Sequence, residues 1–257
     1  MDIVEVSIIM PAFNCEEFIE ESIDSVISQV FPFWELIIVD DQSSDQTWNI
    51  LERKAKEDSR IKIFRNEKNF GAAYTRNYAI SKSIGKYVAF LDGDDVWDIK
   101  KLDKQVNFMN ENNFKFTYSY YDIIDKNNNR SIKYVWSPKK ITYYKMIRMS
   151  RIGCLTVMVD GSIAKNNPIK NTIYRRNDYA LWLKYLKFTD GFCLPEILAS
   201  YRRRSGSISS VSSIKLFKSH LYVFRNSEDF STIKSFLLAL TNSALFLIYK
   251  PFKSRHK

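Results

Sequence analysis

Short apolar segments alternate with helical segments through the first half of this chain. Apolar strands are expected at residues 6–10, 35–39, 61–64 and 87–91. Helices are expected around residues 19–30, 45–55, 72–83 and 102–109, most of them with apolar side chains at a spacing of three or four. Strands that alternate with helices form a parallel sheet that helices cover on both faces. The sequence therefore predicts an α/β fold with a mostly parallel central sheet.

The fourth of these strands runs directly into a cluster of carboxylates, Asp92, Asp94 and Asp95, with Gly93 among them. Carboxylates crowded within four residues repel one another and are costly to desolvate, so the cluster suggests a compensating cation. Magnesium and manganese fit, because hard divalent ions take oxygen ligands and often bind one or two carboxylates together with substrate phosphates. The alternative is an ordinary solvated loop or a helix cap.

Polar or exposed residues also follow two other predicted strands. Phe13 and Asn14 come after the first strand, and Asp40 and Asp41 come after the second. The carboxyl ends of parallel strands meet at one edge of the sheet, where α/β proteins bind ligands. We therefore expect these residues to face the same crevice as the carboxylates of residues 92–95.

The second half of the chain gives weaker signals. A strand is expected at residues 115–121 and a polar turn at residues 125–130. Residues 140–200 mix short apolar segments with Gly and Pro, and we interpret them as part of the same domain, closing over the crevice. With 257 residues and 45% hydrophobic residues, the chain is long enough to bury a sizeable core.

Charge is distributed unevenly along the chain. The formal net charge is +10, and residues 202–257 alone hold 11 Lys or Arg against 2 Asp or Glu. This asymmetry indicates an acidic partner for the C-terminal part, either a nucleic acid or an anionic membrane surface. A solvated basic tail is the alternative.

Residues 236–249 are rich in Leu and Phe but are interrupted at residues 241–243 by Thr, Asn and Ser. The segment is too short to cross a bilayer easily, and the basic residues that follow it fit a helix lying in the plane of a membrane interface. A helix packed on the domain and a dimer contact are the alternatives.

The cysteine content and the first residues of the chain indicate in which cellular compartment the protein works. Cys15, Cys154 and Cys193 form an odd set without metal-ligand spacing, which fits a reducing cytosol. The first residues lack the positive region and long apolar core of a secretion signal. We expect an intracellular protein.

Six ordered motifs resemble the inverting nucleotide-sugar glycosyltransferases of family 2, of the type that builds bacterial O-antigen, lipopolysaccharide and capsule. They are SIIMPAFN (7–14), IVDDQSSD (38–45), NFGAAYTRN (69–77), DGDD (92–95), NDYALW (177–182) and YRRRSGS (201–207). The resemblance implies the GT-A fold: a glycosyltransferase domain over residues 1–210, with a nucleotide-sugar half at about 1–112 and an acceptor half at about 113–210. A basic, amphipathic, helical extension then covers residues 211–257.

The resemblance implies a nucleotide site built from the ends of the first strands. Pro11, Ala12 and Phe13 would form the wall of the nucleobase pocket, unless Phe13 only caps the core. Asp41 would accept a hydrogen bond from uracil N3–H, while Asp40 shapes the turn.

The residues that approach the phosphates come from later motifs. Gly71 would allow close backbone approach to the nucleotide. Arg76 would supply positive charge near the nucleotide, the alternative being a surface helix residue. Asp92, with Gly93 beside it, would contact the ribose, and Asp94 would bind the Mn²⁺ or Mg²⁺ ion that bridges the donor's phosphates, with Asp95 in support.

Two further positions complete the implied chemistry. Asp178 would be the general base that activates the acceptor hydroxyl, unless it only caps a helix. Arg204 stands where many relatives have a histidine and would bind the leaving diphosphate, unless the basic run of residues 202–204 is a surface feature. Together with Arg76, this run would form the positive half of a diphosphate clamp.

The implied activity is that of a hexosyltransferase. A metal-dependent, inverting enzyme would move a sugar from a UDP-sugar to a hydroxyl of a lipid-diphosphate-linked oligosaccharide, at the inner face of the cell membrane. A sugar nucleotidyltransferase would usually carry a glycine-rich basic loop after the first strand, and residues 11–17 offer none. A nucleic-acid-binding protein is a further alternative, but the basic charge is not interleaved with aromatic residues and the crevice is acidic, so no nucleic-acid partner is expected.

Overall fold

The computed structural model describes residues 4–149, 152–203, 213–249 and 254–256. The described strands are β1 (Val6–Ala12), β2 (Trp34–Asp40), β3 (Ile61–Arg65), β4 (Tyr87–Phe90), β5 (Val96–Trp97), β6 (Phe116–Ile124), β7 (Arg130–Val135), β8 (Lys140–Ile141), β9 (Met158–Asp160), β10 (Gly191–Arg202) and β11 (Ser254–His256). The described helices are α1 (Ile19–Ile27), α2 (Thr47–Glu57), α3 (Ala72–Ser81), α4 (Lys101–Asn112), α5 (Tyr143–Arg148), the short η1 (Cys154–Thr156), α6 (Gly161–Asn166), α7 (Asn177–Tyr185), α8 (Ser213–Asn226) and α9 (Thr232–Tyr249).

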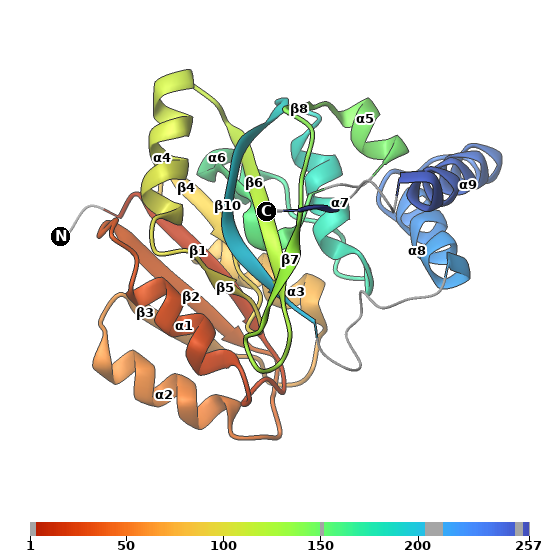
Figure 1. Ribbon diagram of the computed structural model, residues 1–257. Coiled ribbons are helices and arrows are strands. Elements are labelled where there is room, and N and C mark those ends of the chain that lie inside the picture. The colour runs from red at the N-terminus through yellow and green to blue at the C-terminus, as the bar shows by residue number, and fades with distance from the viewer. Residues whose placement is uncertain (1–3, 150–151, 204–212, 250–253, 257) are drawn as a thin grey trace.

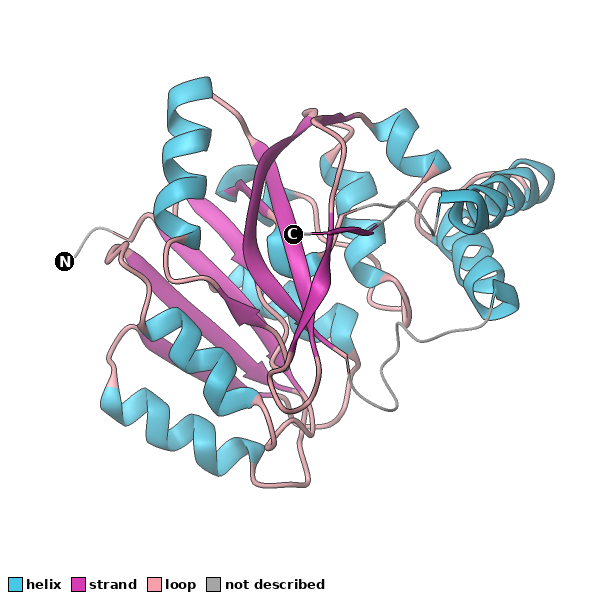
Figure 2. Ribbon diagram, viewed as in Figure 1, coloured by secondary structure: helices cyan, strands magenta, loops and turns pink. Residues whose placement is uncertain are grey.

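One continuous sheet forms the centre of the molecule (Figures 1 and 2). Its first four long strands are parallel and lie in the order β4-β1-β2-β3. All seven residues of β2 are buried, as expected for a strand that helices cover on both faces. The predicted α/β fold is confirmed, and the strands and helices of the first half agree with the expected ones to within three residues.

The second half of the chain extends the same sheet with mixed pairing. β9 is antiparallel to both β4 and β6. The twelve-residue β10 is parallel to β6 and antiparallel to β5 and β8. Since β5 directly follows the acidic loop of residues 92–95, this pairing brings the end of β10 beside that loop.

The helices divide between the two faces of the sheet because apolar residues alternate along each strand. Ile8 and Met10 of β1 pack in a cluster with side chains of α1, α2 and α4. Ile9, between them, packs in a second cluster with side chains of α3, α6 and α7. Figure 1 shows the corresponding helix layers.

The C-terminal helices pack against the domain. Val223 and Phe224 of α8 and Ala239 of α9 are fully buried and belong to the second cluster. The side chain of Asn242, also on α9, donates a hydrogen bond to the carbonyl of Ile147 at the end of α5. Packing of this segment on the domain, one of the alternatives from the sequence, is therefore found for the inward face of α8 and α9.

One observation qualifies the expectation of a helical C-terminal extension. Residues 254–256 form the strand β11, which pairs antiparallel with β7 at the edge of the sheet, so the extension is not helical throughout. None of the described helices combines the length and hydropathy needed to span a membrane.

A buried lysine lies where α4 meets the sheet. Lys101 is 0% exposed, and its Nζ donates to Gln105 Oε1 at 2.5 Å and to the carbonyl of Thr156 at 3.4 Å. The ammonium also lies 4.9 Å from the centre of the Trp97 ring. Burial lowers the pKa of Lys101 to about 7, because the charged form has lost its hydration.

This pKa predicts a pH-dependent contribution to stability. Above pH 7 the unfolded chain still holds the Lys101 proton while the folded protein has lost it, so stability rises with pH. We expect the free energy of unfolding of the protein, relative to that of the Lys101→Met variant, to rise by up to about 1.4 kcal/mol per pH unit between pH 7 and 10. Urea denaturation at several pH values measures this difference. Lys56→Met, at an exposed position of α2, is the control, and a constant difference for Lys101→Met would contradict the prediction.

Candidate active site

The acidic loop, defined as residues 92–95, follows β4 at the carboxyl edge of the parallel strands. The Asp92 side chain is 38% exposed, Asp94 is partly buried and Asp95 is only 1% exposed. Burial, followed by the charges of Asp94 and Asp92, raises the pKa of Asp95 well above its usual value. The loop therefore carries an electrostatic cost that its surroundings must offset.

Arg202, the last residue of β10, holds the acidic loop from the side of the protein interior. Its side chain is fully buried, and its Nε donates to the Asp94 carbonyl at 2.9 Å. Its backbone N–H donates to Asp95 Oδ1 at 2.9 Å. The guanidinium also forms an ion pair with Glu21 of α1 at 2.7 Å and donates to Asn128 Oδ1 at 2.5 Å.

These contacts correct one expectation from the sequence. The basic run of residues 202–204 was expected to face the donor's diphosphate, but all the donors of Arg202 point into the protein. Arg203 is exposed. Arg204 lies outside the described residues, so its assignment to the diphosphate stays a prediction.

Arg76 of α3 joins the acidic loop to the start of α7. Its side chain is buried, which excludes the alternative of a surface helix residue. One terminal nitrogen forms an ion pair with Asp92 Oδ1 at 2.7 Å, and the other donates to Asn177 Oδ1. Burial alone would lower the pKa of Arg76, but the negative charges of Asp92 and Asp178 and the hydrogen bond to Asp92 raise it above its usual value.

Asp178 lies in the first turn of α7 and is partly exposed. Its charge acts on Arg76, on the Cys154 thiol and on Tyr121, as does the charge of the acidic loop, so both lie near these three residues. The helix begins after Arg176, and within the described part of the chain no group donates a hydrogen bond to the Asp178 carboxylate. Asp178 is therefore not the residue that caps α7.

The interior of the domain holds α7 firmly in place. Trp182 is fully buried and meets Phe90 of β4 edge to face, with ring centroids 4.9 Å apart. It packs in the same way against Phe116 of β6 at 5.8 Å. Because Phe90 is the last residue of β4, this contact fixes the position of α7 relative to the strand that leads into the acidic loop.

The ends of β1 and β2 lie together, as the sequence predicted. Pro11 is partly buried, Ala12 is buried, and the Phe13 ring is 48% exposed, so Phe13 does not cap the core. The backbone N–H of Asp41 donates to the Ala12 carbonyl at 2.8 Å. Asp40 is buried and pairs with Arg65 at 3.1 Å, which fits its expected part in shaping the turn.

Asp41 positions the loop before α3. Its Oδ1 accepts from Asn66 Nδ2 at 2.7 Å and from the Phe70 N–H at 2.9 Å, and its Oδ2 accepts from the Gly71 N–H at 2.8 Å. Gly71 has φ +85, a conformation that glycine adopts readily. A carboxylate oxygen can accept two hydrogen bonds, so Oδ2 keeps capacity for one more donor. Asp41 is only 3% exposed and its carboxylate already has this structural role, so its bond to uracil stays a prediction.

Gly93 has a packing reason to be glycine. A Cβ atom at this position would lie 2.7 Å from Cδ1 of Ile19 and 3.2 Å from Sγ of Cys15. The acidic loop therefore sits tightly on α1, and any role of Gly93 toward the nucleotide stays a prediction.

Three residues near the site escaped the sequence reasoning. Tyr121 and Tyr201 meet edge to face, with ring centroids 6.4 Å apart, and Cys154 lies 3.9 Å from a terminal nitrogen of Arg76. Burial raises the pKa of Cys154 well above its usual value, so it is a neutral thiol. Tyr121 lies on β6 and Tyr201 on β10, so their contact comes from a non-local strand pairing, and Cys154 lies in the separate η1.

The donor set at the acidic loop is compatible with a hard divalent ion. In the part of the chain that the structure describes, no three His, Cys, Asp or Glu side chains converge to hold a metal by themselves. The partly buried carboxylates of Asp92 and Asp94 supply the oxygen ligands that Mg²⁺ and Mn²⁺ prefer. They fit a metal that completes its coordination with substrate phosphates and water.

Comparisons with known proteins find relatives along most of the chain. A family model described as "Glycosyl transferase family 2" matches residues 7–179. The chain is 40% identical over 232 residues to "Putative teichuronic acid biosynthesis glycosyltransferase TuaG" of Bacillus subtilis (strain 168), covering 90% of this chain and 91% of that protein. It is 43% identical over 217 residues to "UDP-Glc:alpha-D-GlcNAc-diphosphoundecaprenol beta-1,3-glucosyltransferase WfgD" of Escherichia coli, covering 82% of this chain and 81% of that protein.

A solved structure shares the fold. "Mannosyltransferase PcManGT from Pyrobaculum calidifontis in complex with GDP-Man and Mn2+" has a TM-score of 0.68 to this chain at 16% identity. The match covers 97% of this chain and 75% of that chain. The predicted GT-A architecture is thereby confirmed.

The contrast between two neighbouring arginines provides a test of the site's construction. Arg202→Met leaves Glu21 and the Asp94 carbonyl without their buried donor, so we expect a loss of about 3–5 kcal/mol in the free energy of unfolding. Arg203→Ala changes an exposed side chain, and we expect a change within about 0.5 kcal/mol. Urea denaturation of both variants measures the two effects. Equal effects would show that Arg202 does not hold the loop.

Proposed function

The chain belongs to glycosyl transferase family 2, and on that premise we propose that it is an inverting, metal-dependent enzyme. It moves a sugar from a UDP-sugar to a hydroxyl of a lipid-diphosphate-linked oligosaccharide, in the biosynthesis of a bacterial surface polysaccharide. Family membership decides for a glycosyltransferase over a sugar nucleotidyltransferase or a non-catalytic protein. The donor and acceptor classes are those that the name of the E. coli relative states for that protein.

The donor nucleotide is assigned to the ends of β1 and β2. The half-exposed ring of Phe13 packs against the pyrimidine, with Pro11 and Ala12 behind it. The unused acceptor capacity of Asp41 Oδ2 suits uracil N3–H. Gly71, held by the same carboxylate, allows the chain to pass close to the nucleotide.

The diphosphate and the metal are assigned to the acidic loop. Asp94 would hold Mn²⁺ or Mg²⁺, and Asp92 would contact the ribose. Such an ion neutralises the negative charge on the nucleoside diphosphate as it leaves. Arg76 is buried, so it acts on this region through its charge and by holding Asp92 in place, while Arg204 is proposed as the direct contact to the phosphates.

One observation carries the assignment of the base. Asp178 has no hydrogen-bond donor among the described residues. Its carboxylate lies close enough to Arg76 to raise the pKa of that arginine, as does the carboxylate of Asp92, which pairs with Arg76. A carboxylate that the protein leaves without donors can accept the proton of an acceptor hydroxyl. Attack by that hydroxyl from the side opposite the leaving diphosphate inverts the anomeric centre, and no covalent nucleophile is needed.

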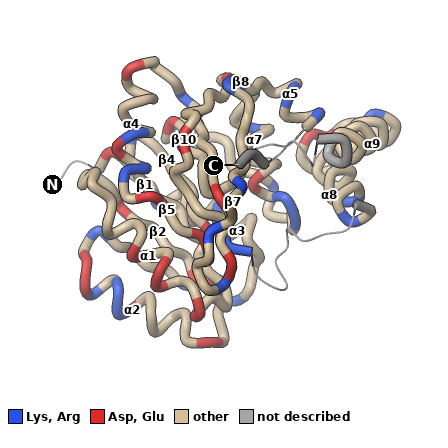
Figure 3. Tube along the Cα trace, viewed as in Figure 1, with Lys and Arg blue, Asp and Glu red and all other residues tan. Residues whose placement is uncertain are grey.

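The C-terminal helices suit a position at the inner face of the cell membrane. Ile233, Phe236, Leu237 and Leu240 lie on one face of α9 and are 49–76% exposed. The neighbouring α8 carries basic segments (Figure 3). An apolar face beside cationic side chains is the pattern of helices that lie on anionic membranes. A dimer contact is the competing use of this face, and sedimentation with anionic vesicles compared with the oligomeric state in solution separates the two.

Removal of the proposed metal ligand tests the donor site. In Asp94→Ala we expect the affinity for a UDP-sugar in the presence of Mn²⁺ to fall by at least about tenfold, because a missing ligand weakens the metal bridge to the phosphates. Calorimetric titration with a panel of UDP-sugars measures this. With the metal chelated, protein and variant should bind alike. If Asp94→Ala binds the UDP-sugar as tightly as the unchanged protein in the presence of Mn²⁺, Asp94 is not the metal ligand.

Removal of the proposed base separates binding from chemistry. Asp178→Asn keeps the size of the side chain but loses the proton acceptor, so we expect transfer to fall by about 10²–10⁴-fold while the affinity for UDP stays unchanged. Release of UDP in the presence of a lipid-linked acceptor measures transfer. Asp103→Asn, on α4, is the matched control and should keep normal activity. Full activity of Asp178→Asn would move the base role to another residue.

A further inference from the structure

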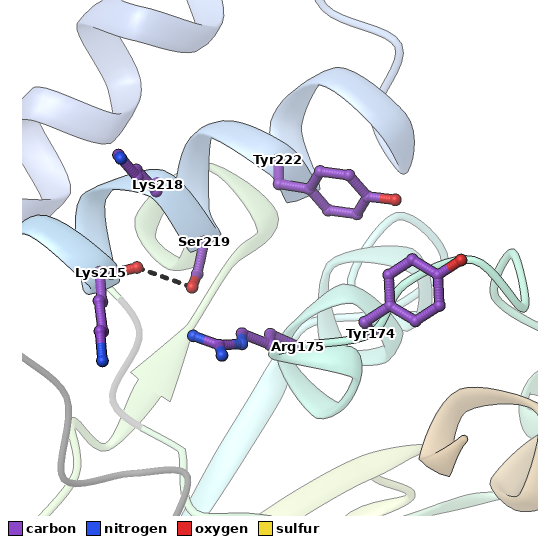
Figure 4. Close-up of a pocket in the computed structure, with 6 residues that line it drawn as sticks. All are labelled: Tyr174, Arg175, Lys215, Lys218, Ser219 and Tyr222. Carbon is purple, nitrogen blue, oxygen red and sulfur yellow. Dashed lines mark hydrogen bonds between the residues drawn. The ribbon is translucent and has the colours of Figure 1, made fainter. Parts of the chain in front are cut away.

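A cavity of about 250 Å³ lies between α8 and the loop that leads into α7. Tyr174 and Arg175 line it from the loop, and Lys215, Lys218, Ser219 and Tyr222 line it from α8 (Figure 4). The guanidinium of Arg175 extends from the loop toward the part of α8 that holds Lys215 and Ser219. None of these residues belongs to the nucleotide site described above.

The lining of this cavity is unbalanced in charge. Three of the six residues are cationic and none is acidic. Of these cations, Arg175 and Lys218 have no carboxylate within ion-pair distance anywhere in the described ranges of the chain. An anion that binds at this cavity can gain charge-assisted hydrogen bonds from these cations.

The remaining side chains add aromatic surface. The rings of Tyr174 and Tyr222 lie 6.5 Å apart, and the Tyr222 hydroxyl donates to the Thr172 carbonyl at 2.9 Å, which ties α8 to the loop. Ser219 donates to the Lys215 carbonyl at 2.8 Å. An aromatic pair beside cations suits a ligand that joins a phosphate to an apolar or sugar group.

The size of the cavity limits the anion. Its volume of about 250 Å³ leaves room for a diphosphate group. Arg175 and Lys218 are exposed, so a ligand can reach them from solvent.

The cavity adjoins the proposed base. Arg175 precedes Asp178 by three residues, and since consecutive Cα atoms are about 3.8 Å apart, their Cα atoms lie within about 11 Å of each other. If the reacting hydroxyl lies on the sugar that carries the diphosphate, as the name of the E. coli relative states for its acceptor, the diphosphate must sit about one sugar ring from the base.

We propose that this cavity binds the diphosphate of the lipid-linked acceptor, through Arg175 and Lys218, and so directs the sugar toward Asp178. The proposal rests on the proposed function and adds to it a binding site for the acceptor. The lipid then leaves along the apolar face of α9, which packs against α8. The site differs in location from the one assigned to the donor's diphosphate at the acidic loop.

Binding of farnesyl diphosphate, a soluble prenyl diphosphate without a sugar, tests the proposal on the full chain. Calorimetric titration is expected to show binding that weakens by about tenfold or more in Arg175→Ala and in Lys218→Ala, because each loses a charge-assisted contact. Lys56→Ala, an exposed lysine of α2, should bind as the unchanged protein does. UDP should bind all four proteins equally, which shows that the variants are folded.

Two control experiments show whether binding depends on the diphosphate, on the prenyl chain or on a membrane surface. Farnesol should not bind measurably, and sedimentation with phosphatidylglycerol vesicles should be the same for all four proteins. Three outcomes would overturn the proposal: the variants bind farnesyl diphosphate as tightly as the unchanged protein, the unchanged protein does not bind it at all, or the substitutions weaken only the sedimentation with vesicles.

Release of UDP from a panel of UDP-sugars in the presence of a lipid-linked sugar acceptor reports on the proposed function independently. If no protein releases UDP from any UDP-sugar while farnesyl diphosphate binding still depends on Arg175, the proposed function fails and the anion site stands. If UDP is released by all four proteins but farnesyl diphosphate binding is unaffected by the substitutions, the anion site fails and the proposed function stands.

Discussion

Two buried guanidinium groups hold the acidic loop in place, and the geometry of the whole site depends on them. Arg202 bonds the backbone carbonyl of Asp94 and pairs with Glu21, while Arg76 pairs with Asp92 and bonds Asn177. Without these donors, the carboxylates at the end of β4 would repel one another in a partly buried setting. Because Arg76 bonds both the loop and the first residue of α7, the same network also positions Asp178.

Much of the first half of the fold could be predicted from the sequence because its signals are local. Apolar runs such as β2 and the helical spacing of α1 show in a window of a few residues, and parallel strands bring their ends together by rule. The convergence of residues 13–14, 40–41 and 92–95 at one edge followed from that rule. The role of Asp40 in the turn also followed from its place after the strand.

The inward position of Arg202 could not be predicted from the sequence. Side chains along a strand alternate between faces, so neighbouring residues at the end of β10 point to opposite faces. Arg202 faces inward and Arg203 is exposed. The inward position arises because β10 pairs with β5 and β6, which are far away in the sequence, and no local pattern announces that pairing.

The account divides the reaction between two regions that meet at the start of α7. Strand ends and the acidic loop form the donor region, and the loop before α7 with α8 forms the acceptor region, with Asp178 between them. The anomeric configuration of the product tests this division most directly, by proton NMR of the saccharide formed from an α-linked UDP-sugar. The account predicts a β-linked product, because a single carboxylate at Asp178 activates the acceptor for direct displacement. An α-linked product would contradict it.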